Sequence, residues 1–208
     1  MCSHYQTLKD AELLLKKFGV HHKPAGDEYD MWPGYLGVIA RRPPEHDAGD
    51  EAVPEREATV GRWGMIPPGT PASKLANAGK VPTFNARSET AHTLWTFRNA
   101  WAKAQHCIIP AHAIFEPDWR PVYEGRAEKS VPTRFTRADV QVSYTMLTIN
   151  ADHDPLFRDY HQAGKEKRMV VILPEGAYGD WLNAPASATR DFLVPFPAER
   201  LVATPTAK

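Results

Sequence analysis

Residues 107–115 read Cys-Ile-Ile-Pro-Ala-His-Ala-Ile-Phe, an apolar and β-branched run in the middle of the chain. Such side chains favour the pleated, half-buried environment of a sheet. Two shorter runs of the same character, 143–150 and 169–173, are bounded by residues that interrupt regular structure, and the segments 35–40 and 59–66 add two more. Together these runs predict the short strands of a mixed sheet.

Two other segments carry apolar residues at helical spacing. Residues 11–18 do so directly before Gly19, and Thr7 with Asp10 resembles a capping box at their start. A second helix is predicted over Ser88–Gln105. The sequence therefore predicts an α+β fold: a single domain with a mixed, mainly antiparallel, barrel-like sheet of short strands flanked by short helices.

The chain has 208 residues, of which 42% are hydrophobic, so one domain over residues 1–208 can bury a substantial core. Because 25 basic residues balance 25 acidic ones, a uniformly basic surface that coats nucleic acid is excluded. Residues 45–57 nevertheless hold six acidic side chains and one basic side chain, and we interpret them as an acidic loop insertion. The remainder of the chain then has a net charge of +5.

Membrane segments and cofactor motifs are not found in the sequence. No run of about 18 apolar residues is present, so we expect a soluble, cytoplasmic protein. Neither glycine-rich phosphate-binding motif occurs, and no cofactor is predicted. Cys2, His4, His21 and His22 include zinc-ligand types, but their spacing matches no standard zinc site, so no metal is predicted. The sequence leaves the oligomeric state open.

Cys2 follows the initiator methionine, which is generally removed when the next side chain is small. Removal of Met1 would give Cys2 a free α-amine beside its thiol. The amine, with an ordinary pKa of about 7.7 to 8.0, can condense with an aldehyde to an imine. The thiolate can then add to the imine carbon and close a five-membered thiazolidine ring. The alternative is that Cys2 has no chemical role and is part of a poorly ordered N-terminus.

Three further segments resemble, in order and spacing, the motifs of the SOS-response-associated peptidase (SRAP) family. They are Arg-Trp-Gly-Met-Ile-Pro at 62–67, Asn-Ala-Arg-Ser-Glu-Thr at 85–90 and Cys-Ile-Ile-Pro-Ala at 107–111, and the Met-Cys start matches as well. The resemblance covers residues 1 to about 183.

The resemblance implies an abasic-site sensor that binds single-stranded DNA. The mature N-terminal cysteine would crosslink covalently to the ring-opened deoxyribose aldehyde, a lyase-like activity, with associated autoproteolytic peptidase activity. The partner is then single-stranded DNA containing abasic sites, and the location is that of a bacterial-type cytoplasmic protein at the nucleoid when DNA is damaged.

The resemblance also assigns roles to residues of this chain. Asn85 would orient the sugar, Arg87 would bind a phosphate, and Glu116 would accept protons beside the cysteine amine. His161 is the candidate for the family histidine that shuttles protons. Without the family context, Asn85 would be interpreted as a helix N-cap and Arg87 as part of a surface salt bridge. Glu116 would be interpreted as a solvated carboxylate, and His161 as a histidine without a catalytic role.

Several family features are altered in this chain, and the expected DNA contacts change with them. His4 stands near the position of a family arginine and can partly replace it when protonated. An aromatic residue expected after Glu116 is replaced by proline, so Trp119 or Trp63 is predicted to stack on a base. Further predicted contacts of the DNA groove are Arg62 and Lys74. Residues 164–167, inserted before Arg168, are interpreted as an exposed loop.

Two alternatives from other functional classes remain open. Cys2 could attack an amide, as in N-terminal-nucleophile hydrolases, where the free amine serves as the base for its own thiol. The chain could also be a non-enzymatic module that binds single-stranded DNA through basic and aromatic residues. Turnover of amide substrates would favour the first, and salt-dependent binding indifferent to abasic lesions would favour the second.

Overall fold

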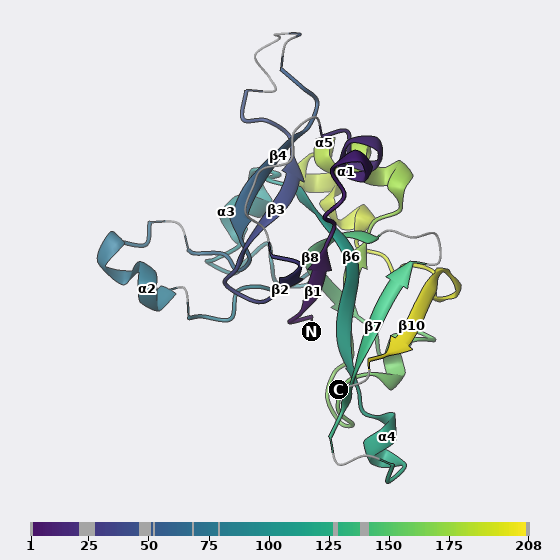
Figure 1. The fold of residues 1–208 in the computed structure, drawn as a ribbon. Coiled ribbons are helices and arrows are strands. Elements are labelled where there is room, and N and C mark those ends of the chain that lie inside the picture. Colours follow the sequence, from purple (N-terminus) through teal and green to yellow (C-terminus); the bar gives the residue numbers. More distant parts are fainter. Residues whose placement is uncertain are drawn as a thin grey trace.

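A computed structural model describes residues 2–20, 28–45, 51, 53–67, 69–78, 80–126, 129–137 and 142–206 (Figure 1). The described chain forms a mixed α+β domain built on one connected sheet of ten strands. In chain order the strands are β1 (Tyr5–Thr7), β2 (Asp30–Met31), β3 (Leu36–Arg41), β4 (Glu57–Arg62), β5 (Ala86–Arg87), β6 (Cys107–Asp118), β7 (Val131–Arg137), β8 (Val142–Asn150), β9 (Arg168–Ile172) and β10 (Leu201–Pro205).

The helices are short and lie between strands or after the last central strand. They are α1 (Ala11–Phe18), η1 (Ala72–Lys74), α2 (Leu75–Ala78), α3 (Arg98–Ala102), α4 (Arg120–Tyr123), η2 (Phe157–Asp159), η3 (Glu175–Ala177), α5 (Tyr178–Asn183), η4 (Ala186–Phe192) and η5 (Ala198–Arg200). None of the helices in the described part of the chain is both long and apolar enough to cross a membrane.

The central strand of the sheet is β6, which pairs antiparallel with β1, β3, β7 and β8. Strand β5 pairs with β8 in parallel, so the sheet is mixed but mainly antiparallel, as predicted. Among the described residues, the pairing runs from β10 through β7, β6 and β1 to β2 without returning to its start. The predicted mixed, mainly antiparallel sheet with short helices is confirmed, and among the described residues the sheet is not closed into a barrel.

Strand β6 confirms the prediction for residues 107–115 and extends it to Asp118. Ile108 and Ile114 are fully buried, as expected for a strand with neighbours on both sides. The extension places Glu116 within the sheet rather than on a solvated loop. The predicted strands at 143–150 and 169–173 are likewise found, as β8 and β9.

Helix α1 is present over the predicted residues and ends at Gly19, whose φ of 64° requires the left-handed conformation. The predicted capping role of Thr7 is wrong, because Thr7 belongs to β1. Asp10 is the actual N-cap, and its side chain accepts a hydrogen bond from the Leu13 N–H at 3.0 Å.

Replacing Asp10 by alanine is expected to destabilise the protein by about 1 kcal/mol, because the substitution leaves a helix N–H without its acceptor. For a chain of this size the unfolding midpoint should fall by about 2–4 °C. Thermal unfolding followed by circular dichroism measures the change. Lys16→Ala, at an exposed position of the same helix, is the control. An equal loss in both variants would contradict the capping assignment.

Two predicted elements are shorter in the structure. The helix predicted over Ser88–Gln105 is confined to α3, and the residues before it form hydrogen-bonded turns. Helix α3 has no buried residue, so no packed apolar face supports a longer helix. The strand predicted over 59–66 ends at Arg62, because Gly64 has a φ of 117°.

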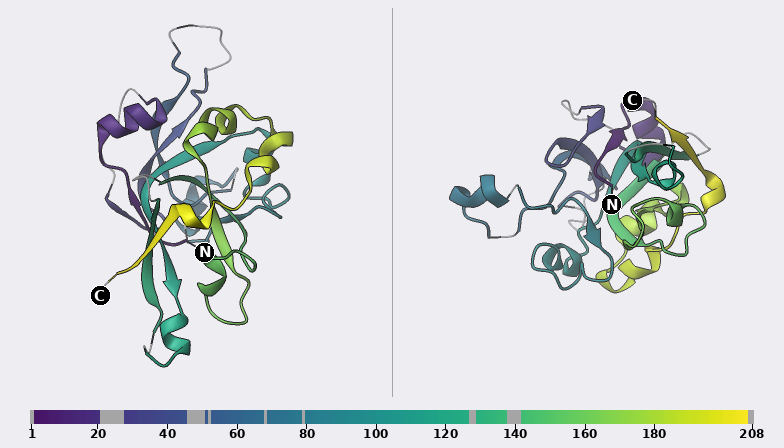
Figure 2. Two further views of the ribbon diagram at one scale, coloured as in Figure 1. Left: turned by 90° about the vertical axis from the view of Figure 1, so that its right-hand side faces the viewer. Right: turned by 90° about the horizontal axis from the view of Figure 1, so that it is seen from below.

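Helix α1 and the start of α5 are in contact at one end of the sheet, and Figure 2 shows the two helices at this end from two further sides. Phe18 stacks on Tyr178 with ring centroids 5.2 Å apart, and Lys17 forms an ion pair with Glu175 at 2.9 Å. Trp181 is buried and donates its indole N–H to the Cys107 carbonyl at 3.0 Å, which ties α5 to the start of β6. This end of the molecule is therefore a packed structural core.

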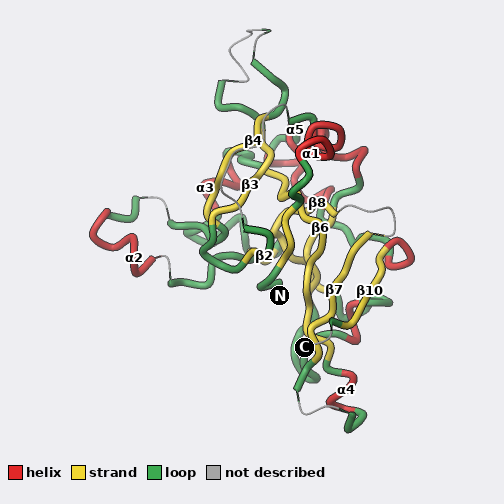
Figure 3. Tube along the Cα trace, in the orientation of Figure 1, coloured by secondary structure: helices red, strands yellow, loops and turns green. Residues whose placement is uncertain are grey.

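The segment between β4 and β5 and the connection between β3 and β4 both project from the body of the domain (Figure 3). The first carries η1 and α2, and its exposed side chains include Lys74 and Leu75. The other connects β3 to β4 and corresponds to the predicted acidic insertion, of which residues 46–50 and 52 lie outside the described residues. The insertion ends earlier than predicted, since Glu57 already belongs to β4, where it pairs with Arg41 at 2.8 Å.

Candidate functional site

Cys2 lies immediately before β1 and is fully buried. Its Sγ–H donates to the His4 carbonyl at 3.2 Å, and the same carbonyl accepts a hydrogen bond from the Phe115 N–H at 3.1 Å. This pairing sets Cys2 beside the end of β6. Burial, followed by the Glu116 carboxylate, raises the pKa of the Cys2 thiol to about 12, so the thiol is protonated at neutral pH. Met1 lies outside the described residues.

Asn85 holds the backbone of Cys2 from the other side. Its Nδ2 donates to the Cys2 carbonyl at 2.7 Å, across 83 residues of sequence. Asn85 directly precedes β5, and the pairing of β5 with β8 fixes its position. The Asn85 Oδ1 atom is buried and has no hydrogen-bond partner among the described residues. An acceptor in this state, next to Cys2, is available to a hydroxyl group of a bound ligand.

Glu116 is the buried carboxyl group of the site, with 1% of its side chain exposed. Burial raises its pKa to about 7, which lies in the range where a group can both accept and donate protons at neutral pH. Its Oε2 lies 3.7 Å from Nε2 of His161. The sequence-based interpretation of Glu116 as an ordinary solvated carboxylate is therefore excluded.

His161 reaches Glu116 from a tight turn in which its own φ is 69°, a left-handed conformation that is uncommon outside glycine. Its Nε2 donates to the Arg168 carbonyl at 2.7 Å. Lys167 Nζ donates to the His161 carbonyl at 3.2 Å and supports the turn. Burial lowers the pKa of His161 to about 4, so its imidazole is neutral at pH 7.

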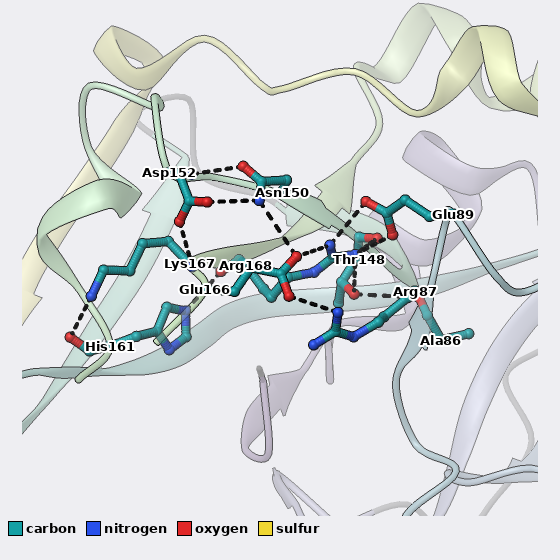
Figure 4. Close-up of polar contacts among 10 residues, drawn as sticks. All are labelled: Ala86, Arg87, Glu89, Thr148, Asn150, Asp152, His161, Glu166, Lys167 and Arg168. Carbon is teal, nitrogen blue, oxygen red and sulfur yellow. Dashed lines mark hydrogen bonds and ion pairs between the residues drawn. The ribbon is translucent and has the colours of Figure 1, made fainter. Parts of the chain in front are cut away.

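Arg87 belongs to a network of alternating charges beside this centre (Figure 4). It pairs with Glu166 at 2.6 Å, and Glu166 also pairs with Arg168 at 2.7 Å. Arg168 in turn binds Glu89 at 2.9 Å. Hydrogen bonds from Arg168 hold the pKa values of Glu89 and Glu166 below their usual range, so both are ionised at neutral pH. Half of the Arg87 side chain is exposed.

The predicted aromatic contacts differ in their accessibility. Trp63 is buried, donates its indole N–H to the Phe84 carbonyl at 3.0 Å, and packs against the Tyr5 and Phe84 rings. Its ring is part of the core and is not open to a base in this structure. Trp119 is half-buried and stacks on exposed Tyr123 with ring centroids 6.3 Å apart.

The predicted basic contacts are also placed. His4 is stacked between Trp32 and Phe115 at 4.2 and 4.1 Å, and its Nε2 is 2.8 Å from Oδ1 of Asp30. Arg62 is half-buried and donates to the Gly64 carbonyl at 2.7 Å. Lys74 lies on η1, in the segment that projects from the body of the domain with α2 (Figure 1).

Two sets of residues at this site were not predicted from the sequence. One is the pair Asp30 and Trp32, which hold His4 from a separate strand and turn. The other is Glu166 and Arg168. Residues 164–167 are a loop before β9 and 164–166 are exposed, as predicted, but the ion pairs that Glu166 makes from this loop were not predicted. The alternation of charge over Lys165, Glu166 and Lys167, directly before Arg168, was the available signal.

Within the described residues no group of three or more His, Cys, Asp or Glu side chains could hold a metal ion. His21 and His22, which were weighed as zinc ligands, lie outside the described residues. The described side chains of the site around Cys2 are one thiol, one carboxyl group, one imidazole and one amide, from Cys2, Glu116, His161 and Asn85.

A family model described as SOS response associated peptidase (SRAP) matches residues 1–208. A crystal structure of a protein from Bordetella bronchiseptica is 62% identical, with all of both chains covered and a TM-score of 0.88. A protein from Bacteroides thetaiotaomicron has a TM-score of 0.74 at 19% identity over 97% of this chain and 90% of its own. A phage-related protein from Bordetella bronchiseptica has a TM-score of 0.62 at 16% identity over 100% and 95%. A comparison with curated proteins finds no match.

Proposed function

This chain belongs to the SOS response associated peptidase family, and we propose that it is an abasic-site sensor that crosslinks single-stranded DNA through Cys2. The single observation that carries this proposal is the convergence on Cys2 of two distant segments, those of Asn85 and Glu116. Asn85 binds the Cys2 carbonyl at 2.7 Å, and the buried Glu116 lies close enough to raise the pKa of the Cys2 thiol.

The proposed reaction needs Cys2 as the first residue. Once the peptide bond to Met1 is hydrolysed, the Cys2 nitrogen becomes a primary amine, and it adds to the aldehyde carbon of a ring-opened abasic site. Loss of one water gives the imine. The thiol then adds its sulfur to the imine carbon and its proton ends on the nitrogen, so aldehyde plus aminothiol yields thiazolidine plus water. The peptidase activity in the family name is assigned here to the hydrolysis that exposes Cys2.

The surrounding side chains supply proton transfer and orientation in this scheme. Glu116, with a pKa of about 7, accepts a proton from the amine or the thiol and returns it to the departing water. His161 lies 3.7 Å from Glu116 through the same Nε2 that donates to the Arg168 carbonyl, so in this scheme it takes up a proton at Nδ1 and holds the imidazolium charge beside that carboxyl group. The buried Oδ1 of Asn85 is available to accept a hydrogen bond from a sugar hydroxyl.

Arg87 is the proposed phosphate contact. A guanidinium group binds phosphate oxygens through paired N–H donors, and half of the Arg87 side chain is exposed. Such contacts dominate the salt-dependent part of binding to single-stranded DNA. The strand docks reversibly first, and the covalent bond at Cys2 follows.

The test is a crosslinking assay with a single-stranded oligonucleotide that carries one abasic site. We expect a product that survives heat and detergent, and whose intact mass equals the protein without Met1 plus the oligonucleotide minus one water. The matched control is the same oligonucleotide with a tetrahydrofuran residue, which has no aldehyde. An equal product with tetrahydrofuran, or none with the abasic site, would overturn the proposal.

A further inference from the structure

Glu166 bridges two arginines that come from different strands. Its Oε2 is 2.6 Å from Arg87 on β5, and its Oε1 is 2.7 Å from Arg168 on β9 (Figure 4). The carboxylate thus occupies the position between two guanidinium groups that an oxyanion of a ligand would take. Glu166 is one-third exposed, so water and solutes reach it.

The two arginines differ in how much they depend on Glu166. Arg168 is almost fully buried and is held independently, by both carboxylate oxygens of Glu89 at 2.9 Å and by the Thr148 carbonyl at 2.6 Å. Arg87 is half exposed, and within the described part of the chain Glu166 is the one carboxylate at ion-pair distance from it. Departure of Glu166 would therefore release Arg87 and leave Arg168 in place.

The backbone around Glu166 is anchored by its neighbour. The Lys167 N–H donates to Oδ1 of Asp152 at 2.8 Å, and Lys167 Nζ donates to the Gln162 carbonyl at 2.8 Å. Rotation of the Glu166 side chain alone is therefore sufficient to vacate the position, and the turn that holds His161 need not move.

We propose that Glu166 is an internal competitor for DNA phosphate, which occupies the anion position at Arg87 until a phosphodiester displaces it. This inference rests on the proposed function, because it takes Arg87 as the phosphate contact. A carboxylate and a phosphodiester bind guanidinium through the same charge-assisted hydrogen bonds, so the exchange replaces one ion pair by another. Because Glu166 must be displaced first, single-stranded DNA binds to Arg87 more weakly than it would if Arg87 had no ion pair with Glu166. Affinity for intact DNA is thereby lowered, and the covalent step carries more of the selectivity.

The test measures binding of an unmodified single-stranded oligonucleotide, which cannot crosslink, by fluorescence anisotropy at low salt. We expect Glu166→Gln to bind roughly two- to fivefold tighter than the unaltered protein, the range that a partly exposed ion pair contributes. Glu175→Gln is the matched control, because it also removes one negative charge from an ion pair whose carboxylate is about one-third exposed. Glu175 pairs with α1, at the packed end of the domain. The control is expected to leave the affinity nearly unchanged.

A double-mutant cycle assigns the effect to Arg87. The gain from Glu166→Gln should disappear in an Arg87→Ala background. Weaker or unchanged binding by Glu166→Gln, or an equal gain in Glu175→Gln, would overturn the inference. Thermal unfolding checks that Glu166→Gln is folded, and if it is not, Glu166→Asp, which keeps the charge on a shorter side chain, is expected to bind more tightly than the unaltered protein.

The crosslinking assay separates the two proposals. Tighter binding by Glu166→Gln without any abasic-site adduct in the unaltered protein would sustain the role of Glu166 and refute the crosslinking function. An adduct in the unaltered protein with no gain in Glu166→Gln would do the reverse.

Discussion

Replacement of Cys2 by alanine is expected to abolish the heat-stable adduct with abasic single-stranded DNA. Alanine keeps the α-amine after removal of Met1 but has no thiol, so the imine can form and the thiazolidine ring cannot close. The imine hydrolyses during heating. Gel electrophoresis under denaturing conditions should therefore show no crosslinked product for Cys2→Ala.

Two measurements separate the roles of the amine and the thiol. With cyanoborohydride present, Cys2→Ala should regain an adduct, because reduction converts the imine to a stable secondary amine. Cys107→Ala is the control for loss of a cysteine, since Cys107 lies within the chain at the start of β6 and has no α-amine beside its thiol. A full heat-stable adduct from Cys2→Ala without reductant would refute Cys2 as the crosslinking residue.

Replacement of Glu116 by glutamine is expected to slow crosslinking by about 100-fold, at the lower end of the contribution of a general acid–base group. The rate of the unaltered protein should rise with pH as the carboxyl group ionises through its pKa of about 7. This ionisation should disappear from the pH profile of the variant. A rate and pH profile equal to those of the unaltered protein would show that Glu116 transfers no proton in the reaction.

Glu116→Gln, which is expected to lower the crosslinking rate, is expected to raise the stability of the folded protein at neutral pH. The pKa of Glu116 is about 7 in the folded protein and about 4.5 when the side chain is exposed, so the folded state binds more protons between these values. The contribution of Glu116 to stability is therefore complete below pH 4.5 and is lost as pH rises through 7. Glu116→Gln should gain stability relative to the unaltered protein between pH 5 and pH 8, as thermal unfolding across this range would measure. A difference in unfolding midpoint that does not vary with pH would contradict burial of an ionisable group here.

The sequence predicted the central strands because their apolar runs are long enough to be recognised locally. Strands β7 and β10 were missed, since Val131–Arg137 contains a proline and two arginines and Leu201–Pro205 is short and largely exposed. Both are edge or near-edge strands whose pairing compensates for weak local preference. The helix over Ser88–Gln105 was overextended for the opposite reason, because apolar spacing without a partner surface does not stabilise a helix.

The candidate site was predictable only where a motif marks it. Asn85 and Glu116 were identified from the family resemblance, and the structure brings both to Cys2. The burial of Trp63 could not be read from its neighbours in sequence, because it depends on Tyr5 and Phe84. The link between Arg87 and Glu166 depends on the pairing of β8 with both β5 and β9, which brings Arg87 on β5 close to Glu166, two residues before β9, although 79 positions separate them.

The pairing of β1 with β6 has a consequence for how this site can be inherited or redesigned. Tyr5 is opposite Ile114, and Gln6 is opposite Ala113. Cys2 lies three residues before Tyr5 of β1, and Glu116 lies two residues after Ile114 of β6. The pairing of Tyr5 with Ile114 therefore fixes the positions of the thiol and the carboxyl group relative to each other. An insertion of one residue between Cys2 and Tyr5 would shift Cys2 along the chain relative to β6 and turn its thiol away from the Glu116 carboxyl group. The number of residues in this short interval is thus as constrained as the identity of the cysteine itself.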